Sequence, residues 1–358
     1  VRIGFVGVGG MGSAHVQNLL NIDGVQIKAL CDIVPAKVER ARKWVVEAGQ
    51  PLPSAYTRGD HDFERMCETE DLDLVFTATP WEWHVPVCLS AMRNGKHAAT
   101  EVPAAVTRDE CEAMVAAARK AGKRLLIGHN QRLANAHVHA RQMIAQGLIG
   151  KPLSFRTVFG HPGPECWTGK PDSWFLSKAA AHFGVLGDLG IHKTDLIHYL
   201  LDEPIVQVSA VLRTMDKRYT TGELVDVEDN ALCLYETRSG VPGSMQVSWT
   251  FYAGEDNSTL IWGTKGLLRL YDDLEYSLIW EPNQGDAEHH RLDELTTNED
   301  QNAGNRTNTG VIDEFIAAVS EGRPSVLDGE QALRAMRVVF AAEESARTGQ
   351  RVDVAQDV

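Results

Sequence analysis

The chain has 358 residues, of which 43% are hydrophobic and 23% are charged, and its net charge is −14 at pH 7. This composition is typical of a globular enzyme, and the length predicts two domains with ample apolar cores. The excess of carboxylates argues against nucleic acid or an anionic membrane as a partner, because both are negatively charged.

The first 32 residues are the most informative stretch of the sequence. An apolar run at residues 1–6 predicts a buried parallel strand, which ends in Gly7-Val8-Gly9-Gly10-Met11-Gly12. Helical periodicity follows over residues 13–22, and a second apolar run at residues 25–30 leads to Asp32. A strand, a glycine turn, a helix, a strand and an acid in this order predict a dinucleotide-binding unit.

Each part of this glycine turn has an expected role. Gly7 permits the tight turn, Gly9 lets the backbone approach a pyrophosphate, and Gly12 lets the helix pack closely on the strand. The start of the helix offers N–H groups and a positive dipole end to the phosphates. We therefore expect cofactor contacts from Gly7, Gly9, Gly10, Met11 and Gly12.

Asp32 is expected to accept hydrogen bonds from the adenosine ribose hydroxyls. A carboxylate at this position would repel a 2′-phosphate, and no arginine follows it directly to hold one. The sequence therefore favours NAD over NADP.

The remaining pattern predicts an α/β protein with two domains. Strands and helices alternate to residue 128, which predicts an NAD-binding Rossmann domain with a doubly wound parallel sheet over residues 1–128. Beyond it, runs of hairpin-like spacing predict an open, mostly antiparallel sheet. Residues 129–358 are therefore expected to form an α/β domain for substrate binding and oligomerisation, whose closing helices can pack back on the first domain.

The cysteines and the apolar runs indicate the cellular compartment in which the protein is expected. The six cysteines are scattered without CxxC pairs, which indicates reduced core thiols in a cytoplasmic protein. We find neither a signal peptide nor an apolar run long enough to cross a bilayer, so export and membrane insertion are not expected. His, Cys and acidic residues do not cluster with metal-ligand spacing, and no metal is expected.

Several short motifs resemble, in their order and spacing, those of the Gfo/Idh/MocA family of NAD(P)-dependent enzymes over essentially the whole chain. They are the glycine turn, Ala78-Thr79-Pro80 with His84, Glu101-x-Pro103, Asp188-x-Gly190-x-His192, Val227-Glu228-Asp229-Asn230-Ala231 and Trp262-Gly263-Thr264-Lys265-Gly266. The resemblance implies a Rossmann domain followed by an α/β domain whose open sheet holds the substrate site. It also implies a homodimer or homotetramer built through that sheet.

One position departs from the family pattern. The usual motif is Glu-Lys-Pro, whose lysine contacts nicotinamide and substrate, but here Val102 occupies the lysine position. The surrounding Trp81-Glu82-Trp83-His84 and Glu101-Val102-Pro103-Ala104-Ala105 are similar to the related NAD-dependent glycoside hydrolases. Those enzymes oxidise a sugar hydroxyl, usually on carbon 3, then eliminate the aglycone, add water and return the hydride.

Three functions are therefore open. The first is an NAD-dependent glycosidase acting on a sugar or glycoside, although the second half lacks the pattern of the N-acetylgalactosaminidase branch. The second is a sugar or polyol dehydrogenase that releases NADH. The third is a non-catalytic NAD-binding regulator, against which the Asp188-x-Gly190-x-His192 motif argues.

Two residues are the candidates for catalysis. An imidazole changes charge near physiological pH, so His192 suits removal of a proton from a sugar hydroxyl; packing within its helix is the alternative. Asp188 lies one helical turn earlier, so both side chains can face one site. Asp188 can bind substrate or orient the imidazole, or it can simply favour the helix N-terminus.

Other contacts are expected mainly from the resemblance. The nicotinamide half of the cofactor is expected to meet Thr79, Pro80, Trp83, His84 and Glu101. Substrate contacts are expected from Arg132, Trp167, Trp174 and Lys193. The tryptophans offer rings on which sugar C–H faces can stack. Lys193 is a candidate to replace the missing lysine, although adjacent helical residues point about 100° apart.

Overall fold

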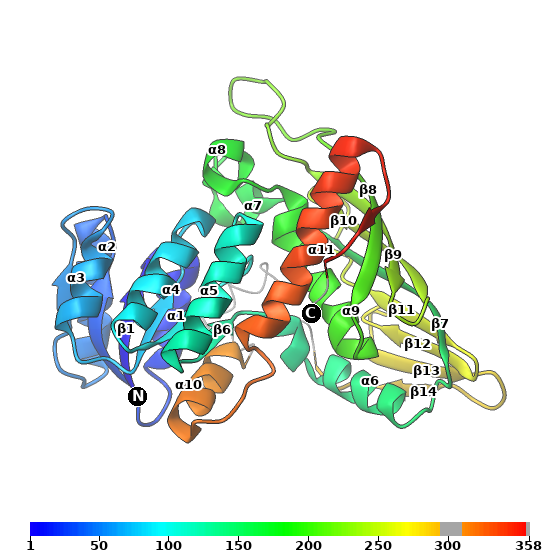
Figure 1. Cartoon of the computed structure of the whole chain (residues 1–358), viewed down its shortest axis with the longest axis horizontal. Coiled ribbons are helices and arrows are strands. Elements are labelled where there is room, and N and C mark those ends of the chain that lie inside the picture. Colours follow the sequence, from blue (N-terminus) through cyan, green and yellow to red (C-terminus); the bar gives the residue numbers. More distant parts are fainter. Residues whose placement is uncertain (294–309, 356–358) are drawn as a thin grey trace. The chain divides into compact units, whose positions relative to one another are not determined.

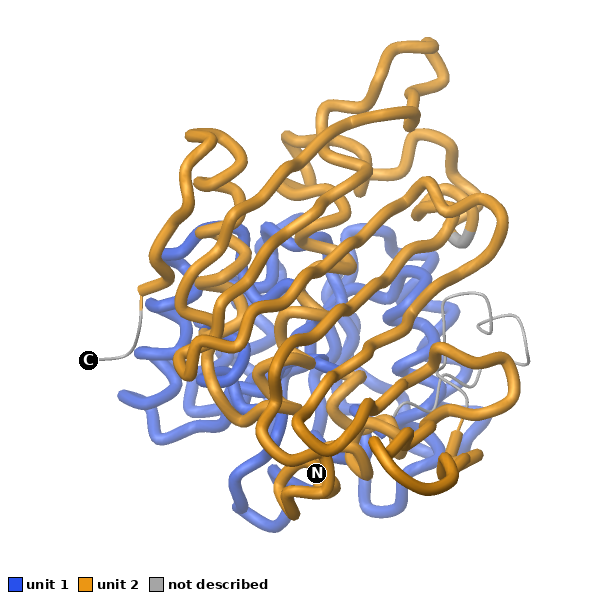
Figure 2. The backbone as a smooth tube through the Cα atoms, turned by 90° about the vertical axis from the view of Figure 1, so that its right-hand side faces the viewer, with its two compact units in different colours: residues 1–129, 296–333 blue, residues 130–295, 334–358 orange. Residues whose placement is uncertain are grey.

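The computed structural model describes residues 1–293 and 310–355 (Figure 1). It divides into two compact units, shown in separate colours in Figure 2. Unit 1 comprises Val1–His129 with the described part of Thr296–Leu333, and unit 2 comprises Asn130–Leu295 with Arg334–Val358. Helix α11 (Gly329–Thr348) is divided between the two units.

Unit 1 contains a parallel sheet of six strands among its described residues, in the order β3-β2-β1-β4-β5-β6. This order and direction confirm the predicted doubly wound sheet. The strands β1 and β4 at its centre are mostly apolar, and all their residues except Arg2 are buried, as expected where helices cover both faces. The strands are β1 (Arg2–Val6), β2 (Gln26–Cys31), β3 (Ser54–Tyr56), β4 (Leu74–Thr77), β5 (His97–Thr100) and β6 (Leu125–Ile127).

Helix α5 of unit 1 begins and ends at local capping signals. In α5, Thr107 accepts a hydrogen bond from the Glu110 N–H at the start, and Gly122 adopts a left-handed conformation at the end. Ring contacts join Phe76 of β4 to Phe5 of β1 and to Phe315 of α10, so α10 packs on the sheet of unit 1. The helices are α1 (Gly10–Leu19), α2 (Pro35–Glu47), α3 (Asp62–Thr69), η1 (Trp81–Trp83), α4 (His84–Arg93), α5 (Arg108–Ala121) and α10 (Val311–Glu321).

Unit 2 contains a sheet of nine strands among its described residues, in the order β14-β13-β12-β11-β7-β10-β9-β8-β15. Only β7 and β10 pair in parallel, which confirms the prediction of a mostly antiparallel sheet. Three strands were not predicted: β13, β14 and β15. The strands are β7 (Pro152–Gly160), β8 (Ile205–Arg213), β9 (Asn230–Thr237), β10 (Pro242–Ser248), β11 (Thr259–Gly263), β12 (Gly266–Leu270), β13 (Leu278–Pro282), β14 (Glu288–His290) and β15 (Val352–Asp353).

The helices η4 and α9 of unit 2 pack on one face of this sheet, against β7, β9 and β10. Between β7 and α9 the chain forms only short helices. The helices of unit 2, besides its part of α11, are η2 (Asn130–Leu133), α6 (Asn135–Ala145), α7 (Pro164–Thr168), η3 (Trp174–Leu176), α8 (Lys178–Ala181), η4 (Leu186–Gly190) and α9 (Ile191–Leu201).

In the described part of the chain, no helix combines the length and apolarity needed to cross a bilayer. Five cysteines are buried, as expected for core thiols, but Cys166 is exposed. The expectation of a core thiol is wrong for Cys166 because this residue lies on the short surface helix α7.

A buried ion pair ties η2 to α9 within unit 2. Arg132 donates two hydrogen bonds to the Asp195 carboxylate, at 2.6 and 2.7 Å, and both side chains are almost inaccessible to solvent. Removing one partner of such a pair leaves an uncompensated charge in the core.

We therefore expect Arg132→Met to lower the free energy of unfolding by about 3–5 kcal/mol, measured by denaturant titration. Replacing both partners, as Arg132→Met with Asp195→Leu, should recover much of this loss, because no buried charge is then left alone. If the free energy of unfolding of Arg132→Met alone lay within about 1 kcal/mol of the wild-type value, this account of the pair would be contradicted.

Candidate active site

The glycine turn of unit 1 has the local geometry that a dinucleotide requires. Gly7 has a φ of +86°, and a Cβ atom there would lie 2.6 Å from the Ala78 carbonyl oxygen. A Cβ atom at Gly12 would lie 1.9 Å from the Gly7 oxygen, so both glycines are required by packing within the protein. At Gly9 and Gly10, by contrast, a Cβ atom would meet nothing within 4 Å. The backbone is therefore open at the start of α1, where the N–H groups and dipole favour a phosphate.

Asp32 is fixed at the end of β2 by this turn. Its carboxylate accepts hydrogen bonds from the N–H groups of Val8 and Val34, both at 2.8 Å. A carboxylate has about four acceptor sites, so acceptors remain for ribose hydroxyls. The ammonium of Lys37, a residue that the sequence analysis did not single out, lies 3.9 Å from Asp32 Oδ1.

Glu101 and His84 occupy different environments in unit 1. The Glu101 carboxylate lies 2.5 Å from His15 Nε2 of α1, which brings it to the helix that follows the glycine turn. His84 is fully buried, and its two ring nitrogens lie 2.9 Å from Pro103 O and 3.1 Å from Thr79 O. Burial lowers the pKa of His84. In this structure His84 ties two loops together, and a direct contact with the cofactor stays a prediction.

The loop after β4 contains the remaining expected cofactor contacts of unit 1. Thr79 hydrogen-bonds Thr77 through their hydroxyls, at 2.9 Å, and Pro80 immediately precedes η1. The ring of Trp83 is half-buried and lies edge-on to His61 and Phe63, with centroids 5.3 and 6.2 Å apart. Trp83 is thus anchored on the α3 side of the loop.

In unit 2, Asp188 and His192 lie on the same side of η4 and α9, and we call this pair the strip. Within the fully described segment 185–200, which comprises most of η4 and α9, every residue is buried except Asp188 and His192, which are partly exposed. The residues are four apart on consecutive helical turns, so both side chains reach the same open surface. A buried aromatic side chain supports each: Trp249 contacts Asp188, and the Phe159 ring lies 6.2 Å from that of His192.

The carboxyl group of Asp188 has an unusual proton affinity. Removal from water raises its pKa to about 7, and a hydrogen bond from the Trp249 indole, at 3.0 Å, opposes this rise. A carboxyl group that is half-ionised near neutral pH can accept or donate a proton there. A perturbed acid beside a partly exposed histidine is the strongest chemical feature of unit 2.

Two adjacent carboxylates in the Val227–Ala231 motif position the segments around this strip. Glu228 accepts hydrogen bonds from the N–H groups of Gly184 and Leu186, at 2.9 and 3.1 Å, at the start of η4. Asp229 accepts three from the N–H groups of residues 215–217, at 2.8 to 2.9 Å. The sequence resemblance identified this motif but gave it no role.

The residues of unit 2 that were expected to contact the substrate lie in different environments. Arg132 is bound by Asp195 in the core. Lys193 is fully buried and donates to Asn257 O at 2.8 Å, and burial lowers its pKa to about 7. Trp174 is half-buried and stacks on Phe175, with centroids 3.9 Å apart. Trp167 lies in α7, but its side chain is outside the described part of the structure. Direct substrate contact by these residues stays a prediction.

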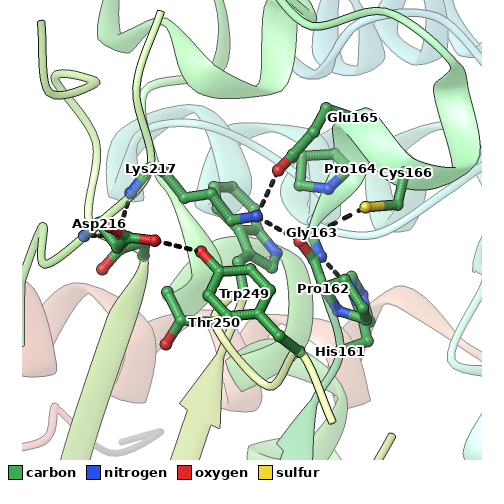
Figure 3. Close-up of polar contacts among 12 residues, drawn as sticks. His161, Pro162, Gly163, Pro164, Glu165, Cys166, Asp216, Lys217, Trp249 and Thr250 are labelled. Carbon is green, nitrogen blue, oxygen red and sulfur yellow. Dashed lines mark hydrogen bonds and ion pairs between the residues drawn. The ribbon is translucent and has the colours of Figure 1, made fainter. Parts of the chain in front are cut away.

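The sequence analysis missed several residues near the strip: Trp249, His161, Glu165 and Lys217 (Figure 3). None belongs to a recognisable motif. A signal existed for His161 and Glu165, which lie in the segment 161–182 that is rich in Gly, Pro and Trp, and for Trp249, which lies in the alternating run 244–251. In the described residues, no group of three or more His, Cys, Asp or Glu side chains has the arrangement of a metal site.

Two family models match most of the chain. Residues 1–129 match the oxidoreductase family with an NAD-binding Rossmann fold, and residues 137–269 match the GFO/IDH/MocA C-terminal domain.

Curated relatives match a smaller part. A glycosyl hydrolase family 109 protein of Shewanella pealeana is 37% identical, and an alpha-N-acetylgalactosaminidase of Shewanella oneidensis is 36% identical, each over 161 residues. Each match covers 45% of this chain and 35% of the relative, so the chain spans about a third of the length of these relatives.

Among solved structures, aldose-aldose oxidoreductase from Caulobacter crescentus, complexed with glycerol, is similar over 99% of both chains. Its TM-score is 0.80 and its sequence identity is 25%.

The raised pKa of Asp188 predicts a pH-dependent cost to stability. Between about pH 4 and pH 7 the unfolded carboxyl ionises while the folded one stays protonated, so folded stability falls as pH rises through this window. Asp188→Asn cannot ionise. We expect its unfolding temperature, relative to that of the wild-type protein, to rise from pH 5 to pH 8.

The exposed Asp286→Asn is the matched control, for which the difference should stay constant across the same pH range. If the difference in unfolding temperature between Asp188→Asn and the wild-type protein is equally constant, the Asp188 carboxyl ionises normally.

Proposed function

The chain belongs to the Gfo/Idh/MocA family of NAD-binding oxidoreductases, and we propose that it is an NAD-dependent glycosidase that works through transient oxidation of a sugar hydroxyl. The observation that supports this most is the strip formed by Asp188 and His192. It presents an acid with a pKa near 7 and an imidazole on one surface, and every other side chain between residues 185 and 200 is buried.

The cofactor is NAD, and the residues of unit 1 fit it. Gly9 and Gly10 leave the backbone open for the pyrophosphate, and Asp32 keeps acceptors for the ribose. When bound, NAD supplies a hydride acceptor that returns the hydride at the end of the cycle and so is not consumed.

We assign the proton transfers of this reaction to residues of unit 2. We assign His192 as the base that removes the proton of the sugar hydroxyl while the carbon beneath it is oxidised. The ketone formed on carbon 3 makes the proton on carbon 2 acidic, so the aglycone leaves by elimination and water adds to carbon 1. Asp188, whose pKa lies near 7, can take up and return a proton in these steps without a large free-energy cost.

Val102 favours the glycosidase over a simple dehydrogenase. Valine has no group that can hold or transfer a proton, so the lysine chemistry that many dehydrogenases of the family use is missing at this position. The relatives named as family 109 glycosyl hydrolases support the same choice. Since the chain spans about a third of their length, their activity and substrate are proposals for it.

A sugar dehydrogenase is the second candidate. The similarity to an aldose-aldose oxidoreductase over 99% of both chains favours it, because that protein is an oxidoreductase by name. In that case the oxidised sugar would leave as product.

One assay separates the two functions. The purified protein is incubated with NAD and with 4-nitrophenyl glycosides or free sugars, while NADH absorbance and aglycone release are recorded together. We expect aglycone release over many turnovers, dependent on NAD and without accumulation of NADH. Stoichiometric NADH from a free sugar, without cleavage of any glycoside, would establish the dehydrogenase instead.

His192→Ala tests the assignment of the base. Loss of a positioned acid–base group should lower turnover by about 10² to 10⁴, while NAD affinity stays unchanged because the glycine turn is intact. His289→Ala, which replaces an exposed histidine of unit 2, is the control. Turnover within a few-fold of the wild-type rate would remove His192 from the mechanism.

We also propose that the outer face of the unit 2 sheet forms a homo-oligomer interface. Leu232 and Leu234 of β9 are 48% and 60% exposed and point away from α9, because the alternate residue Tyr235 faces it and hydrogen-bonds Thr194. Val211 of β8 pairs with Leu232 and is 51% exposed, which extends the apolar surface. Exposed apolar patches of this kind mark interfaces.

Light scattering should therefore find a dimer or tetramer, and Leu232→Glu with Leu234→Glu should shift it to a smaller species. Leu274→Glu is the control, because Leu274 is fully exposed and lies outside the strands. A wild-type monomer, or an assembly that is unchanged in the double variant, would contradict the proposal.

A further inference from the structure

A rigid turn follows β7 at the same edge of the sheet as Asp188. We call residues 161–165 (His161-Pro162-Gly163-Pro164-Glu165) the Gly163 turn (Figure 3). Prolines on both sides fix their own φ, and Gly163 has a φ of +105°, a value that side chains disfavour. A Cβ atom at Gly163 would also lie 2.8 Å from both Glu165 Oε2 and Lys217 Nζ.

Lys217, which lies in the loop between β8 and β9, stabilises this turn. Its side chain is 5% exposed, and its ammonium donates to Pro162 O and pairs with Glu165 Oε1 (Figure 3). Asp229 fixes the Lys217 backbone through its N–H at 2.9 Å. The ammonium also lies 4.8 Å from the centroid of the Tyr252 ring. The turn is therefore held in one conformation before any ligand binds.

This well-ordered turn contains a buried donor that the described residues leave without a partner. His161 is 4% exposed, and its Nδ1 accepts a hydrogen bond from the Gly163 N–H at 3.0 Å. The proton of the neutral ring must then reside on Nε2. Burial, with the nearby Lys217 charge, lowers the pKa of His161 to about 4, so the ring is neutral. Its Nε2 has no hydrogen-bond partner among the described residues.

Glu165 provides a complementary acceptor. Its Oε1 is taken by Lys217, but its buried Oε2 also has no hydrogen-bond partner within the described chain. Nearly all buried polar atoms in proteins have a partner, and leaving one unpaired costs free energy. A donor and an acceptor that stay unpaired on one preorganised turn point to a ligand that supplies both.

The Gly163 turn lies close to Asp188 and His192. The His161 N–H donates to Ser248 O at 3.0 Å, next to Trp249, whose indole binds Asp188. Phe159 lies two residues before His161, on the same side of the strand, and its ring centroid is 5.8 Å from that of His161. The same Phe159 ring lies beside His192.

We propose that His161 and Glu165 form a hydroxyl-binding subsite, in which His161 Nε2–H donates to, and Glu165 Oε2 accepts from, hydroxyl groups of a neutral carbohydrate. This inference rests on the proposed function and narrows its substrate class. A sugar hydroxyl is both donor and acceptor, so neighbouring hydroxyls of one ring can satisfy both protein atoms.

The charges around the subsite disfavour an anionic substituent. Lys217 is the one cation of the cluster drawn in Figure 3, and it already pairs with Glu165. Asp216 accepts a hydrogen bond from the Tyr252 hydroxyl at 2.7 Å, and Asp229 lies behind Lys217. Acidic groups therefore outnumber the ammonium, and a sulfate or carboxylate would be repelled.

His161→Phe removes the donor and keeps a ring of similar size. With NAD present, we expect it to raise KM about 10- to 100-fold for the 4-nitrophenyl glycosides of N-acetylgalactosamine, galactose or glucose that the wild-type protein cleaves. Glu165→Gln should also raise KM. His289→Phe, which replaces an exposed histidine of unit 2, is the control and should leave KM unchanged.

Monodeoxy glycosides identify the hydroxyl that is bound. The wild-type protein should discriminate against one deoxy sugar by a similar factor, and His161→Phe should lose that discrimination. An unchanged KM in the folded variants, on a substrate that is turned over, overturns the subsite alone. Absence of sugar binding by the wild-type protein in calorimetry overturns both the subsite and the proposed function. If His161→Phe does not fold, Glu165→Gln decides.

Discussion

The arrangement of unit 2 depends on two adjacent carboxylates just before β9, of which Asp229 is fully buried and Glu228 is partly buried. Burial alone raises the pKa of Glu228, and the N–H groups of Gly184 and Leu186 oppose that rise. At Asp229, burial acts in the same direction, but hydrogen bonds from three backbone N–H groups and from Asn230 keep its pKa below the usual value. Each carboxylate stays buried only because it replaces lost water with backbone donors. Those donors belong to the segments that present Asp188 and Lys217.

These backbone hydrogen bonds explain how a site that lowers the stability of the fold is held in place. Asp188 loses hydration without gaining a cationic partner among the described residues, and its carboxylate accepts a hydrogen bond from the neutral indole of Trp249. His161 likewise keeps a donor that has no partner in the described part of the chain. Such groups reduce stability, and proteins retain them where function requires them. The surrounding core, including the Arg132–Asp195 pair, provides the compensating rigidity.

The sequence predicted the fold well where the signal is local. Apolar runs and the glycine turn identified the Rossmann unit, because each strand and helix there has its own periodicity. The strands β14 and β15 were missed because they are only three and two residues long, too short for an alternating pattern. The candidate site was predicted only in part. Asp188 and His192 followed from a motif, whereas Arg132 and Lys193 have buried partners more than 60 residues away that no local pattern indicates. The His161, Glu165 and Lys217 cluster likewise depends on contacts between residues 52 and 55 positions apart.

The central claim is that a sugar is oxidised, eliminated, hydrated and reduced within one catalytic cycle. Its most direct test is to cleave a glycoside in D₂O and to measure deuterium at carbon 2 of the released sugar by NMR, with the sugar alone as a control for spontaneous exchange. Elimination breaks the carbon 2 C–H bond, and addition of water restores it with a solvent proton, so the account predicts one deuterium at carbon 2. A released sugar that retains its original hydrogen at carbon 2 would contradict the account.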